Sequence, residues 1–539
     1  MTRAEWERSV LAPARAKAPE RAPDNHAPSA PVDLLCTPDD VADIDYDRDI
    51  ADPGQFPFTR GAQSTGYQNR PWVTRPSATF GTPVEANAEY CRLLAAGATG
   101  LSVEFDRPTL MGRDPDHPLP AGVGHHGISV ASVSDMLDLF AGIDLGAVPV
   151  TMAITGPAPM MFAIFLVAAE RRGVAWSALS GALQQNVWSG FIFPARPTMR
   201  LMTDVTTFCR THVPRWSPVS VSGCGLREAG ATAQQELSFT LCHAIARVGH
   251  AIDAGLDVDD IGPVLTVALS AHGDFFEDIA KHRAARQVWA RVMRDRFGAR
   301  TDRASALQLH TQTSRASLVT HEPSSNAVRT TLQALAAVLG GTDSLHTNAY
   351  DDVLGRPTAA AATLALRTQQ VLAQECGLTG AVDPFGGSWW VERLTRDFAD
   401  RTLSDIDAID RLGGMVAAVE QGVPQRQVAD VAHRTRADRR ASAGGPVVGS
   451  VEVLAAGEPQ VLVRESDGAG VRQQRDSAAL AAALDRLRQT ASGRGNTMDV
   501  FIECARAGAR VGEMCEVLRA EWGEFVESPA NGAGGASAG

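Results

Sequence analysis

Short runs in which apolar and polar residues alternate recur along the chain and predict strands with two chemically different faces. In the clearest run, 306–314, His310 and Gln312 lie on the polar face and leucines on the other. The same alternation occurs in 219–223, 263–270 and, less regularly, 344–348. Packed β/α barrels fill their interior with Val, Ile and Leu. Several strands with small polar residues on one face therefore suggest a barrel whose axis holds a ligand.

Between about residues 55 and 400, strand-like runs alternate with helical stretches, which predicts a parallel (β/α)8 TIM barrel of the α/β class. The candidate strands are 100–105, 148–154, 219–222, 264–269, 307–312 and 344–347. The amphipathic segments 236–254 and 274–297 predict two of the intervening helices. The apolar segment 152–169 is interrupted by Gly156 and two prolines, so it predicts a buried strand, turn and helix rather than a membrane span.

Composition divides the chain into four parts. Residues 1–30 are rich in Ala, Pro and Arg and predict a flexible N-terminal arm, and residues 31–400 hold the predicted barrel. Residues 401–527 predict a helical C-terminal extension with a Gly-rich patch at 441–449. The small, Gly-rich residues 528–539 predict a disordered tail.

Charge and cysteine content limit the function classes. The net charge of -12 leaves no basic surplus to neutralise phosphates, so we expect no nucleic-acid partner, although local basic residues can still bind an anionic ligand. The 8 cysteines in 539 residues show neither metal-ligand spacing nor a disulfide framework. The N-terminus lacks an apolar signal core. We therefore expect a reduced, cytoplasmic protein with no metal site and no membrane association.

Eight short motifs occur in a fixed order along most of the chain. They are Phe58-Thr-Arg-Gly61, Arg70-Pro-Trp72, Gly100-Leu-Ser-Val-Glu-Phe-Asp106, Arg227-Glu-Ala-Gly-Ala231, His310-Thr-Gln-Thr-Ser314, Gly341-Thr-Asp-Ser-Leu-His-Thr-Asn348, Asp383-Pro-Phe-Gly-Gly-Ser388 and Gly413-Gly-Met415. Through them the chain, from about residue 31 to residue 524, resembles the adenosylcobalamin-dependent acyl-CoA mutases, the methylmalonyl-CoA mutase family. The resemblance implies a TIM barrel, an acyl-CoA substrate and an isomerase. In the family reaction, homolysis of the cobalt–carbon bond yields a 5′-deoxyadenosyl radical that abstracts hydrogen before the carbon skeleton rearranges.

Family members that carry their own cobalamin domain contain an Asp-x-His-x-x-Gly loop whose His ligates cobalt. This loop is not found here, and Asp114-Pro-Asp116-His117 has the residues at the wrong spacing. The resemblance therefore implies a large subunit that receives adenosylcobalamin from a separate cobalamin-binding small subunit, in a hetero-oligomer.

The resemblance also implies candidate substrate-binding residues. They are Gln63, Ser64, Thr65, Gly66, Arg70, Thr74 and Arg75 at the CoA entry, and Ser77, Ser102, Gln184, Arg215, Gly225, Val264 and Thr266 around the acyl thioester. A guanidinium suits a phosphate or the thioester tail. The competing interpretations are ordinary surface contacts for the arginines and a core amide that satisfies backbone groups for Gln184.

Further residues are implied near the cobalamin-facing end of the barrel. His310 and Gln312 are candidate catalytic residues, with Gln184 and Glu104, and His310, Asp343 and Asp352 are candidate cofactor-binding residues. Asp352 stands where the family has a Glu that binds the adenosyl ribose, and Asp343 stands where it usually has Gln. A satisfied core histidine and a solvated loop carboxylate are the alternatives.

Departures from methylmalonyl-CoA mutase bear on the substrate. Ser77 replaces the aromatic residue that wedges against the substrate, and a deletion between Gln184 and Phe191 removes the Arg that pairs the substrate's free carboxylate. An unpaired buried carboxylate is costly, so a dicarboxylic acyl-CoA is not expected. Val264 replaces an Arg. Gly225 replaces the His that hydrogen-bonds the thioester carbonyl, and losing such a donor can cost about 2.7–4 kcal/mol.

Glu104 stands where methylmalonyl-CoA mutase has a small residue and the 2-hydroxyisobutyryl-CoA mutases have an Asp that bonds the substrate hydroxyl. With Ser77 it would form a roomier and more polar pocket, suited to a hydroxylated or otherwise polar branched acyl group. Alternatively, Glu104 pairs with a nearby Arg. Within the family, segments 106–114 and 212–216 also resemble the 2-hydroxyisobutyryl-CoA and isobutyryl-CoA mutase branch more than the other members.

Three hypotheses remain open. The chain is the large subunit of a mutase acting on a short, non-dicarboxylic acyl thioester, or a catalytically degenerate relative that serves as a binding or regulatory subunit. The third is an active enzyme in which Cys224, Glu104 or Asp343 takes over a lost role. Because Val264 carries no charge, the sequence also leaves open whether the acyl group is carried on CoA or on a carrier protein.

Overall fold

The structure is a computed structural model that describes residues 3–17, 34–78, 80–117, 123–124, 127–186, 192–441 and 476–525. The predicted tail 528–539, residues 18–30 of the predicted arm and nearly all of the Gly-rich patch lie outside the described residues. Residues 187–191, which include most of the predicted deletion point, also lie outside them.

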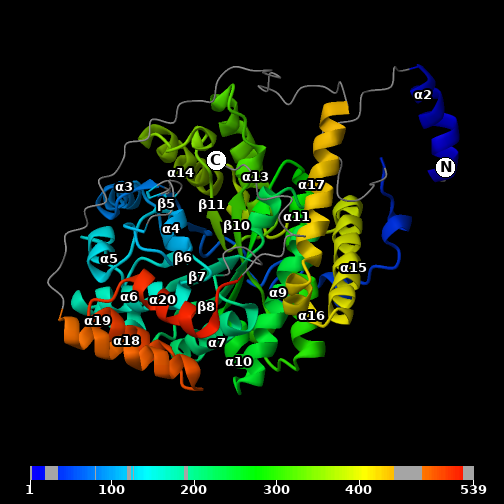
Figure 1. The fold of residues 1–539 in the computed structure, drawn as a ribbon. Coiled ribbons are helices and arrows are strands. Elements are labelled where there is room, and N and C mark those ends of the chain that lie inside the picture. Colours follow the sequence, from blue (N-terminus) through cyan, green and yellow to red (C-terminus); the bar gives the residue numbers. More distant parts are fainter. Residues whose placement is uncertain are drawn as a thin grey trace.

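A barrel of parallel strands forms the centre of the molecule (Figure 1). In order of pairing, its strands are β1 (Val73–Thr74), β11 (Ser344–His346), β10 (Gln308–Thr313), β9 (Leu265–Ala271), β8 (Trp216–Ser222), β7 (Gly181–Asn186), β6 (Val150–Ala153), β4 (Leu101–Glu104) and β2 (Ser77–Ala78). β1 and β2 are halves of one strand, interrupted at Pro76, which has no N–H to give to the ladder. β1 pairs with β11 and β2 pairs with β4, so the sheet closes on itself as eight parallel strands. The TIM-barrel prediction is confirmed.

Six barrel strands match the predicted ones, but two were not predicted. The segment 73–78 is short and broken by Pro76, and β7 has the sequence GALQQN, which lacks β-branched and aromatic residues. β7 forms a strand because its two edges make backbone hydrogen bonds with β6 and β8. Its strand conformation is therefore set by its neighbours rather than by its own propensity.

Helices cover the outside of the barrel between successive strands (Figure 1). The main ones are α3 (Pro83–Ala95), α5 (Val133–Leu139), α6 (Ala158–Arg171), α7 (Ala195–His212), α9 (Ala233–Asp253), α11 (Phe275–Arg291), α13 (Asn326–Leu339) and α14 (Ala359–Gln374). Shorter elements are α4 (Arg107–Leu110), α8 (Cys224–Glu228), α10 (Val258–Ile261), α12 (Asp302–Ser305), and the paired strands β3 (Phe80–Gly81) and β5 (Gly127–Ile128). Local sequence sets the starts of several helices: Thr82 and Thr232 each form a capping box at α3 and α9. The two predicted helices correspond to α9 and to α11 with the turn Val292–Arg296.

Two groups of helices lie outside the barrel ring. α15 (Trp389–Arg411) packs on α11 and α9, α16 (Gly414–Glu420) also contacts α9, and α17 (Val423–Ala441) follows α16. α18 (Ser477–Ser492) packs on both α19 (Met498–Arg506) and α20 (Val511–Trp522), and α19 and α20 pack on α6. At the N-terminus, α1 (Arg3–Trp6) and α2 (Ala12–Lys17) precede the barrel, and Arg3 Nη1 lies 2.7 Å from Asp40 Oδ1.

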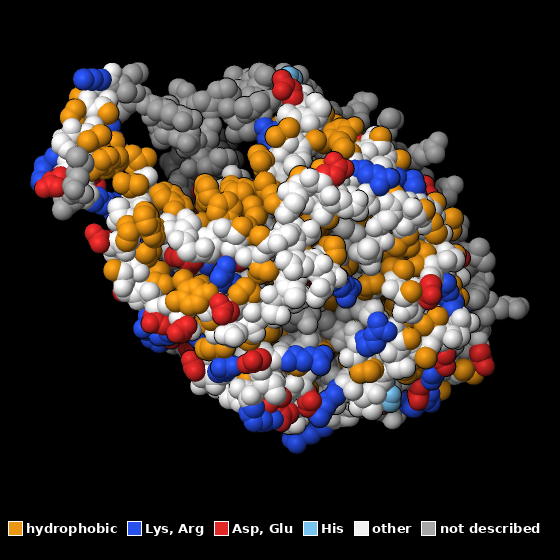
Figure 2. Space-filling model, turned by 180° about the vertical axis from the view of Figure 1, so that it is seen from behind, with side chains coloured by type: hydrophobic (Ala, Val, Ile, Leu, Met, Phe, Trp, Pro, Cys, Tyr) orange, Lys and Arg blue, Asp and Glu red, His pale blue; other side chains and the backbone are white. Residues whose placement is uncertain are grey.

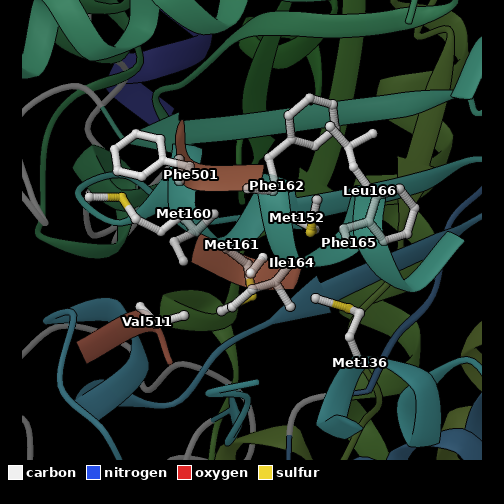
Figure 3. Packing of buried hydrophobic residues seen from close by; sticks show 14 of the residues in the cluster. Met136, Met152, Met160, Met161, Phe162, Ile164, Phe165, Leu166, Phe501 and Val511 are labelled. Atoms are coloured by element: carbon white, nitrogen blue, oxygen red, sulfur yellow. The ribbon is translucent and has the colours of Figure 1, made fainter. Parts of the chain in front are cut away.

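α6 is apolar on every side because it is buried between two layers. Met152 of β6 lies on its barrel side, and Phe501 of α19 and Val511 of α20 belong to the same hydrophobic cluster (Figure 3). The segment 152–169 thus forms the predicted buried strand, turn and helix. Among the helices of the described residues, none combines the length and apolar composition needed to cross a membrane. Figure 2 shows Lys, Arg, Asp and Glu side chains interspersed over the face opposite to the view of Figure 1.

Candidate active site

The register of the barrel places its polar side chains on the inside. Paired residues of parallel strands share a face, and alternate residues follow on the same face. The register joins Ser102 with Thr151, Gln184 with Ser220, Thr266 with Gln308, His310 with Ser344, and Gln312 with His346. The opposite faces carry residues such as Val103, Met152, Val221, Val267 and Leu309, which belong to the hydrophobic clusters under the helices. The barrel axis is therefore lined by hydroxyls, amides and imidazoles, as the alternation in 306–314 predicts.

Arg75 carries a positive charge into this lining. Its Nη1 donates to Thr151 Oγ1 and its Nη2 donates to Ser344 Oγ. No carboxylate pairs with it among the residues that the structure describes, and burial lowers its pKa to about 10. A surface ion pair, the alternative interpretation from sequence, does not apply to Arg75. A guanidinium held by hydroxyls alone can bind a carbonyl or an anion of a ligand on the barrel axis.

His310 and His346 lie on the inner face of neighbouring strands, two positions apart in register. Ser344 accepts from His310 Nδ1 through its carbonyl at 3.1 Å, and Ser344 Oγ lies 2.9 Å from the same nitrogen. A carbonyl only accepts, so Nδ1 carries the proton and Nε2 is left as an acceptor. Burial, followed by the charge of Arg75, holds the pKa of His310 well below its usual range. Burial also lowers the pKa of His346, so both imidazoles are neutral at pH 7.

Two carboxylates converge at the C-terminal mouth of the barrel. Glu104 ends β4, and Asp352 begins a short turn (Asp352–Leu354) after β11. Burial raises the pKa of Glu104, with the Ser77 hydroxyl and the Arg315 charge partly opposing it. Burial raises the pKa of Asp352 to about 6, where Arg315 and His346 oppose the shift and Glu104 adds to it. The two acids are therefore coupled electrostatically.

The surroundings of these acids exclude two alternatives raised from the sequence. Glu104 has no ion pair within the described residues, although Arg315 is close enough to affect its pKa. Asp352 is only 6% exposed, so it is not a solvated loop carboxylate. It lines a pocket of about 150 Å³ together with Ser77 and His346, and the helices α3 and α14 supply most of the other lining residues. Ser77 Oγ is buried and completes no hydrogen bond of normal geometry in the described part of the chain.

The position of the expected His is occupied by a glycine at the start of α8. Gly225 is exposed, and its neighbour Cys224 is buried. Burial, then the charge of Glu236, raises the pKa of Cys224 to about 12, so its thiol stays protonated and acts at most as a weak donor. Behind it, Lys281 Nζ donates to Glu236 Oε2 at 2.8 Å and to Asp278 Oδ1 at 2.9 Å. This buried cluster supports the C-terminal end of β9.

A cavity of about 520 Å³ opens at the N-terminal end of the barrel. Gln63, Arg70, Arg303, Gln308 and Asp343 are among the residues that line it. Ser64, Thr65 and Gly66 form the adjoining turn, in which Gly66 N donates to Gln63 O at 3.1 Å. The predicted CoA-entry segment therefore lies at an opening that leads toward the axis.

Three candidate substrate-binding residues, Thr74, Arg215 and Val264, do not lie on the inner face of the barrel strands. Thr74 shares the outer face with Leu345, and its Oγ1 lies 3.2 Å from Thr99 Oγ1. Arg215 is exposed before β8, where its Nη1 donates to Ala178 O at 3.3 Å. Val264 precedes β9, and its carbonyl accepts from Ser217. The roles of these three residues stay predictions.

Asp343 lies at the N-terminal end of β11, whereas Asp352 lies beyond its C-terminal end. The Asp343 carboxylate accepts from Leu309 N at 2.8 Å, and burial raises its pKa. The structure therefore does not bring Asp343 together with Asp352, and its cofactor-binding role stays a prediction.

Sequence reasoning missed four residues of the lining or its mouths: Thr151, His346, Arg303 and Arg315. His346 lay in a quoted motif, and its alternation with Leu345 was a usable signal. The other three have no local signal, because their positions follow from strand pairing and from loops that meet only in the fold.

The fold and site define a (β/α)8 barrel whose axis is lined by polar side chains and whose N-terminal end carries a cavity. The methylmalonyl-CoA mutase family profile matches residues 26–524, and the chain belongs to this family. It is 38% identical over 548 residues to the 2-hydroxyisobutanoyl-CoA mutase large subunit of Aquincola tertiaricarbonis, covering 98% of this chain and 97% of that one.

Two further relatives are longer than this chain. Identity to the methylmalonyl-CoA mutase of Rhizobium meliloti is 39%, covering 92% of this chain and 72% of that one. Identity to the methylmalonyl-CoA mutase large subunit of Streptomyces virginiae is 38%, covering 91% and 70%. The chain is thus an acyl-CoA mutase, an isomerase.

Proposed function

We propose that this chain is the acyl-CoA-binding large subunit of an adenosylcobalamin-dependent mutase that isomerises a short, branched acyl thioester bearing a hydroxyl group. The observation that carries the proposal is the placement of Glu104. Ser77 pairs in register with Ser102, and Glu104 follows Ser102 on the same inner face, at the C-terminal mouth. A carboxyl group with a raised pKa can accept a hydrogen bond from a substrate hydroxyl when ionised and donate one when protonated.

Electrostatics at this mouth disfavour a second carboxylate on the substrate. Glu104 lies close enough to Asp352 at this mouth to raise its pKa, and a substrate carboxylate beside these acids would meet like charges while losing its water. Arg75, farther along the axis, already has two of its nitrogens bound to hydroxyls. Its remaining donors suit the thioester tail. A hydroxylated, non-dicarboxylic acyl group satisfies both conditions.

The family implies adenosylcobalamin, which when bound supplies the radical through homolysis of its cobalt–carbon bond. The residues at the C-terminal mouth fit its adenosyl side. Asp352 is buried, lines the 150 Å³ pocket and accepts no hydrogen bond at its carboxylate within the described residues, so it can accept from ribose hydroxyls. His346 lines the same pocket, and Gln312 pairs with it in register. His310 lies two positions before Gln312 on the same inner face and offers its Nε2 as an acceptor. The surrounding barrel excludes water from the reacting groups.

We further propose a hetero-oligomer in the cytoplasm, in which a separate small subunit binds most of the cobalamin. Two of the relatives are named large subunits, which supports a partner of this kind.

One observation favours a second candidate, a catalytically degenerate subunit. Gly225 stands where the resemblance expects the His that polarises the thioester, and the neighbouring Cys224 offers only a protonated thiol. In that case the chain would bind acyl-CoA without isomerising it.

The test mixes the full chain anaerobically with adenosylcobalamin, a cobalamin-binding small subunit and a panel of hydroxylated, plain branched and dicarboxylic acyl-CoAs. We expect cob(II)alamin formation and an isomerised thioester with the hydroxylated substrate. Glu104→Gln should lower kcat/KM for that substrate by about 100-fold or more, because a site built for a hydroxyl discriminates strongly. Glu375→Gln, at an exposed helix end, is the matched control.

Turnover of the dicarboxylic substrate in preference to the others would contradict the assigned substrate class. Acyl-CoA binding without cob(II)alamin formation across the panel would favour the degenerate subunit.

A further inference from the structure

We propose that Arg315 is a positioning residue at the C-terminal mouth of the barrel, where its guanidinium keeps Glu104 and Asp352 available as hydrogen-bond acceptors for hydroxyl groups. The inference rests on the proposed function and deepens it, because a carboxyl group accepts only when ionised and also donates when protonated. Arg315 begins a short turn (Arg315–Ser317) just after β10. It therefore lies at the same end of the barrel as Glu104, which ends the parallel strand β4.

Hydrogen bonds from two helices fix the backbone of this turn. Glu228 Oε1 of α8 accepts from Arg315 N and from Ser314 Oγ, each at 2.9 Å. On the other side, Gln333 Oε1 of α13 accepts from Ser314 N at 3.1 Å, and Gln333 Nε2 donates to Ser317 Oγ at 2.6 Å. The turn is thus tied to both helices, so the Arg315 side chain starts from a defined position.

The Arg315 guanidinium lies beside Asp352 without being bound to a carboxylate. Its Nη2 donates to the main-chain carbonyl of Asp352 at 2.8 Å. Among the residues that the structure describes, Arg315 forms no ion pair, and its Nε and Nη1 donate no hydrogen bond. The contact holds the positive charge near the mouth but leaves it unneutralised. The charge can therefore act on more than one acid.

Acids outnumber cations around Asp352. Burial raises the pKa of Asp352 to about 6, the Arg315 charge opposes this shift, followed by His346, and the charges of Glu104 and Asp351 add to it. His346 gives no lasting opposition, because burial lowers its own pKa and the imidazole is neutral at pH 7. At pH 7 Arg315 is therefore the charged group that opposes protonation of Asp352.

Arg315 also connects Asp352 with Glu104. Burial raises the pKa of Glu104, and the Ser77 hydroxyl and the Arg315 charge oppose the shift. An opposite charge at about 4–6 Å lowers the pKa of a carboxyl group by about 1–3. Without Arg315 the Asp352 carboxyl would thus be at least half protonated at pH 7, and Glu104 would change in the same direction. One guanidinium keeps both acids in the accepting form.

The test titrates the full chain without cofactor and detects protonated carboxyl groups by infrared difference spectroscopy. Glu104→Gln and Asp352→Asn assign the two bands. Arg315→Met removes both the charge and the hydrogen bond to Asp352 O, Arg315→Gln keeps a donor without the charge, and Arg315→Lys keeps the charge. The matched control is Arg300→Met, because Arg300 lies before β10 and pairs with Asp257 at 2.8 Å on the surface.

We expect Arg315→Met and Arg315→Gln to move the titration midpoint of Asp352 upward from about pH 6 by about 1–3 pH units, and that of Glu104 in the same direction. Arg315→Lys should reverse most of this shift, and Arg300→Met should leave both midpoints unchanged. With the small subunit, adenosylcobalamin and a hydroxylated acyl-CoA, the acidic limb of the kcat/KM profile should move upward as well. Activity lost near pH 6 should then return as the pH is raised.

Wild-type midpoints in Arg315→Met would overturn the inference and leave the proposed mutase intact. Wild-type midpoints in Arg315→Gln alone would also overturn it, because the hydrogen bond to Asp352 O rather than the charge would then be responsible. A loss of activity that is the same at every pH would assign Arg315 a structural role and overturn the inference too. If the wild type isomerises no acyl-CoA while the midpoints shift as expected, the proposed function fails and the effect of Arg315 on the two acids stands.

Discussion

Lys281→Met tests whether the buried cluster behind β9 stabilises the barrel. Lys281 is 0% exposed, and its ammonium donates to Glu236 Oε2, Asp278 Oδ1 and Ser270 O at 2.8, 2.9 and 2.6 Å. The same carboxylates accept backbone N–H groups, from Ser270 to Glu236 and from His272 to Asp278, each at 2.6 Å. Methionine has a similar volume and no charge, so the substitution removes the cation without opening a large cavity.

The expected cost follows from what the substitution leaves behind. Two buried carboxylates lose the ammonium group that pairs with both of them, and breaking a buried pair in this way costs about 3–5 kcal/mol. A surface ion pair such as that of Arg300 contributes about 0–1 kcal/mol, so Arg300→Ala is a control of the same charge change. The predicted difference between the two variants therefore exceeds about 2 kcal/mol.

The pH dependence gives an independent check. Burial alone would lower the pKa of Lys281, but the charges of Asp278 and Glu236 outweigh burial, so the pKa of Lys281 is raised. Burial would raise the pKa of Asp278, but the charges of Lys281 and Arg227 outweigh burial, so the pKa of Asp278 is lowered. A lysine whose pKa is higher in the folded than in the unfolded protein stabilises the fold at lower pH, and this stability is lost as the pH rises through the folded-state pKa. An aspartate whose pKa is lower in the folded protein stabilises the fold at higher pH, and this stability is lost as the pH falls through the folded-state pKa. The wild-type contribution is therefore present from about pH 4 to about pH 10. In Lys281→Met the pKa of Asp278 should rise, so the loss of stability should shrink below about pH 5.

The assay is urea unfolding of both variants and the wild type at pH 5 and pH 8, followed by circular dichroism. Adding Asp278→Asn to Lys281→Met should recover part of the stability, because it removes one uncompensated charge. A loss below about 1 kcal/mol at pH 8, or a loss equal to that of Arg300→Ala, would refute the reasoning.

Two further predictions concern carboxylates with raised pKa values. Burial raises the pKa of Asp114 to about 6, while its carboxylate accepts from Gly512 N at 2.9 Å. Above pH 6 the buried carboxylate is ionised, which destabilises the fold. The variant Asp114→Asn keeps a hydrogen-bond acceptor but carries no charge. In urea titrations it should be more stable than the wild type by about 1–2 kcal/mol at pH 8 and equal to the wild type near pH 4. The contrary outcome is a variant that is less stable at both pH values. The pKa of Asp352 is raised to about 6. The variant Asp352→Asn should therefore weaken cofactor binding and remove a titration near pH 6 from the pH profile of activity. An unchanged pH profile would exclude Asp352 from the site.

Local alternation was sufficient to predict the two faces of β10. A strand has a period of two, so Leu307 and Leu309 must share one side while His310 and Gln312 share the other. The same reasoning found six barrel strands, because each carries enough apolar residues for its outer face. It missed 73–78 and β7, whose sequences are polar or broken by Pro76 and become strands only through pairing on both edges. The motifs that carried the family resemblance located most of the candidate site.

Sequence alone thus determined the fold class, the polar character of the barrel axis and the membership of the family, because these depend on residue type and spacing. Tertiary structure decided which charges are compensated. Arg294, Arg300 and Arg303 look equivalent in the sequence, yet in the fold two of them meet carboxylates and one faces a cavity. Likewise, Asp343 and Asp352 lie 9 positions apart but at opposite ends of β11. Pairing and burial depend on which segments meet in space, and that information is not present in any one segment.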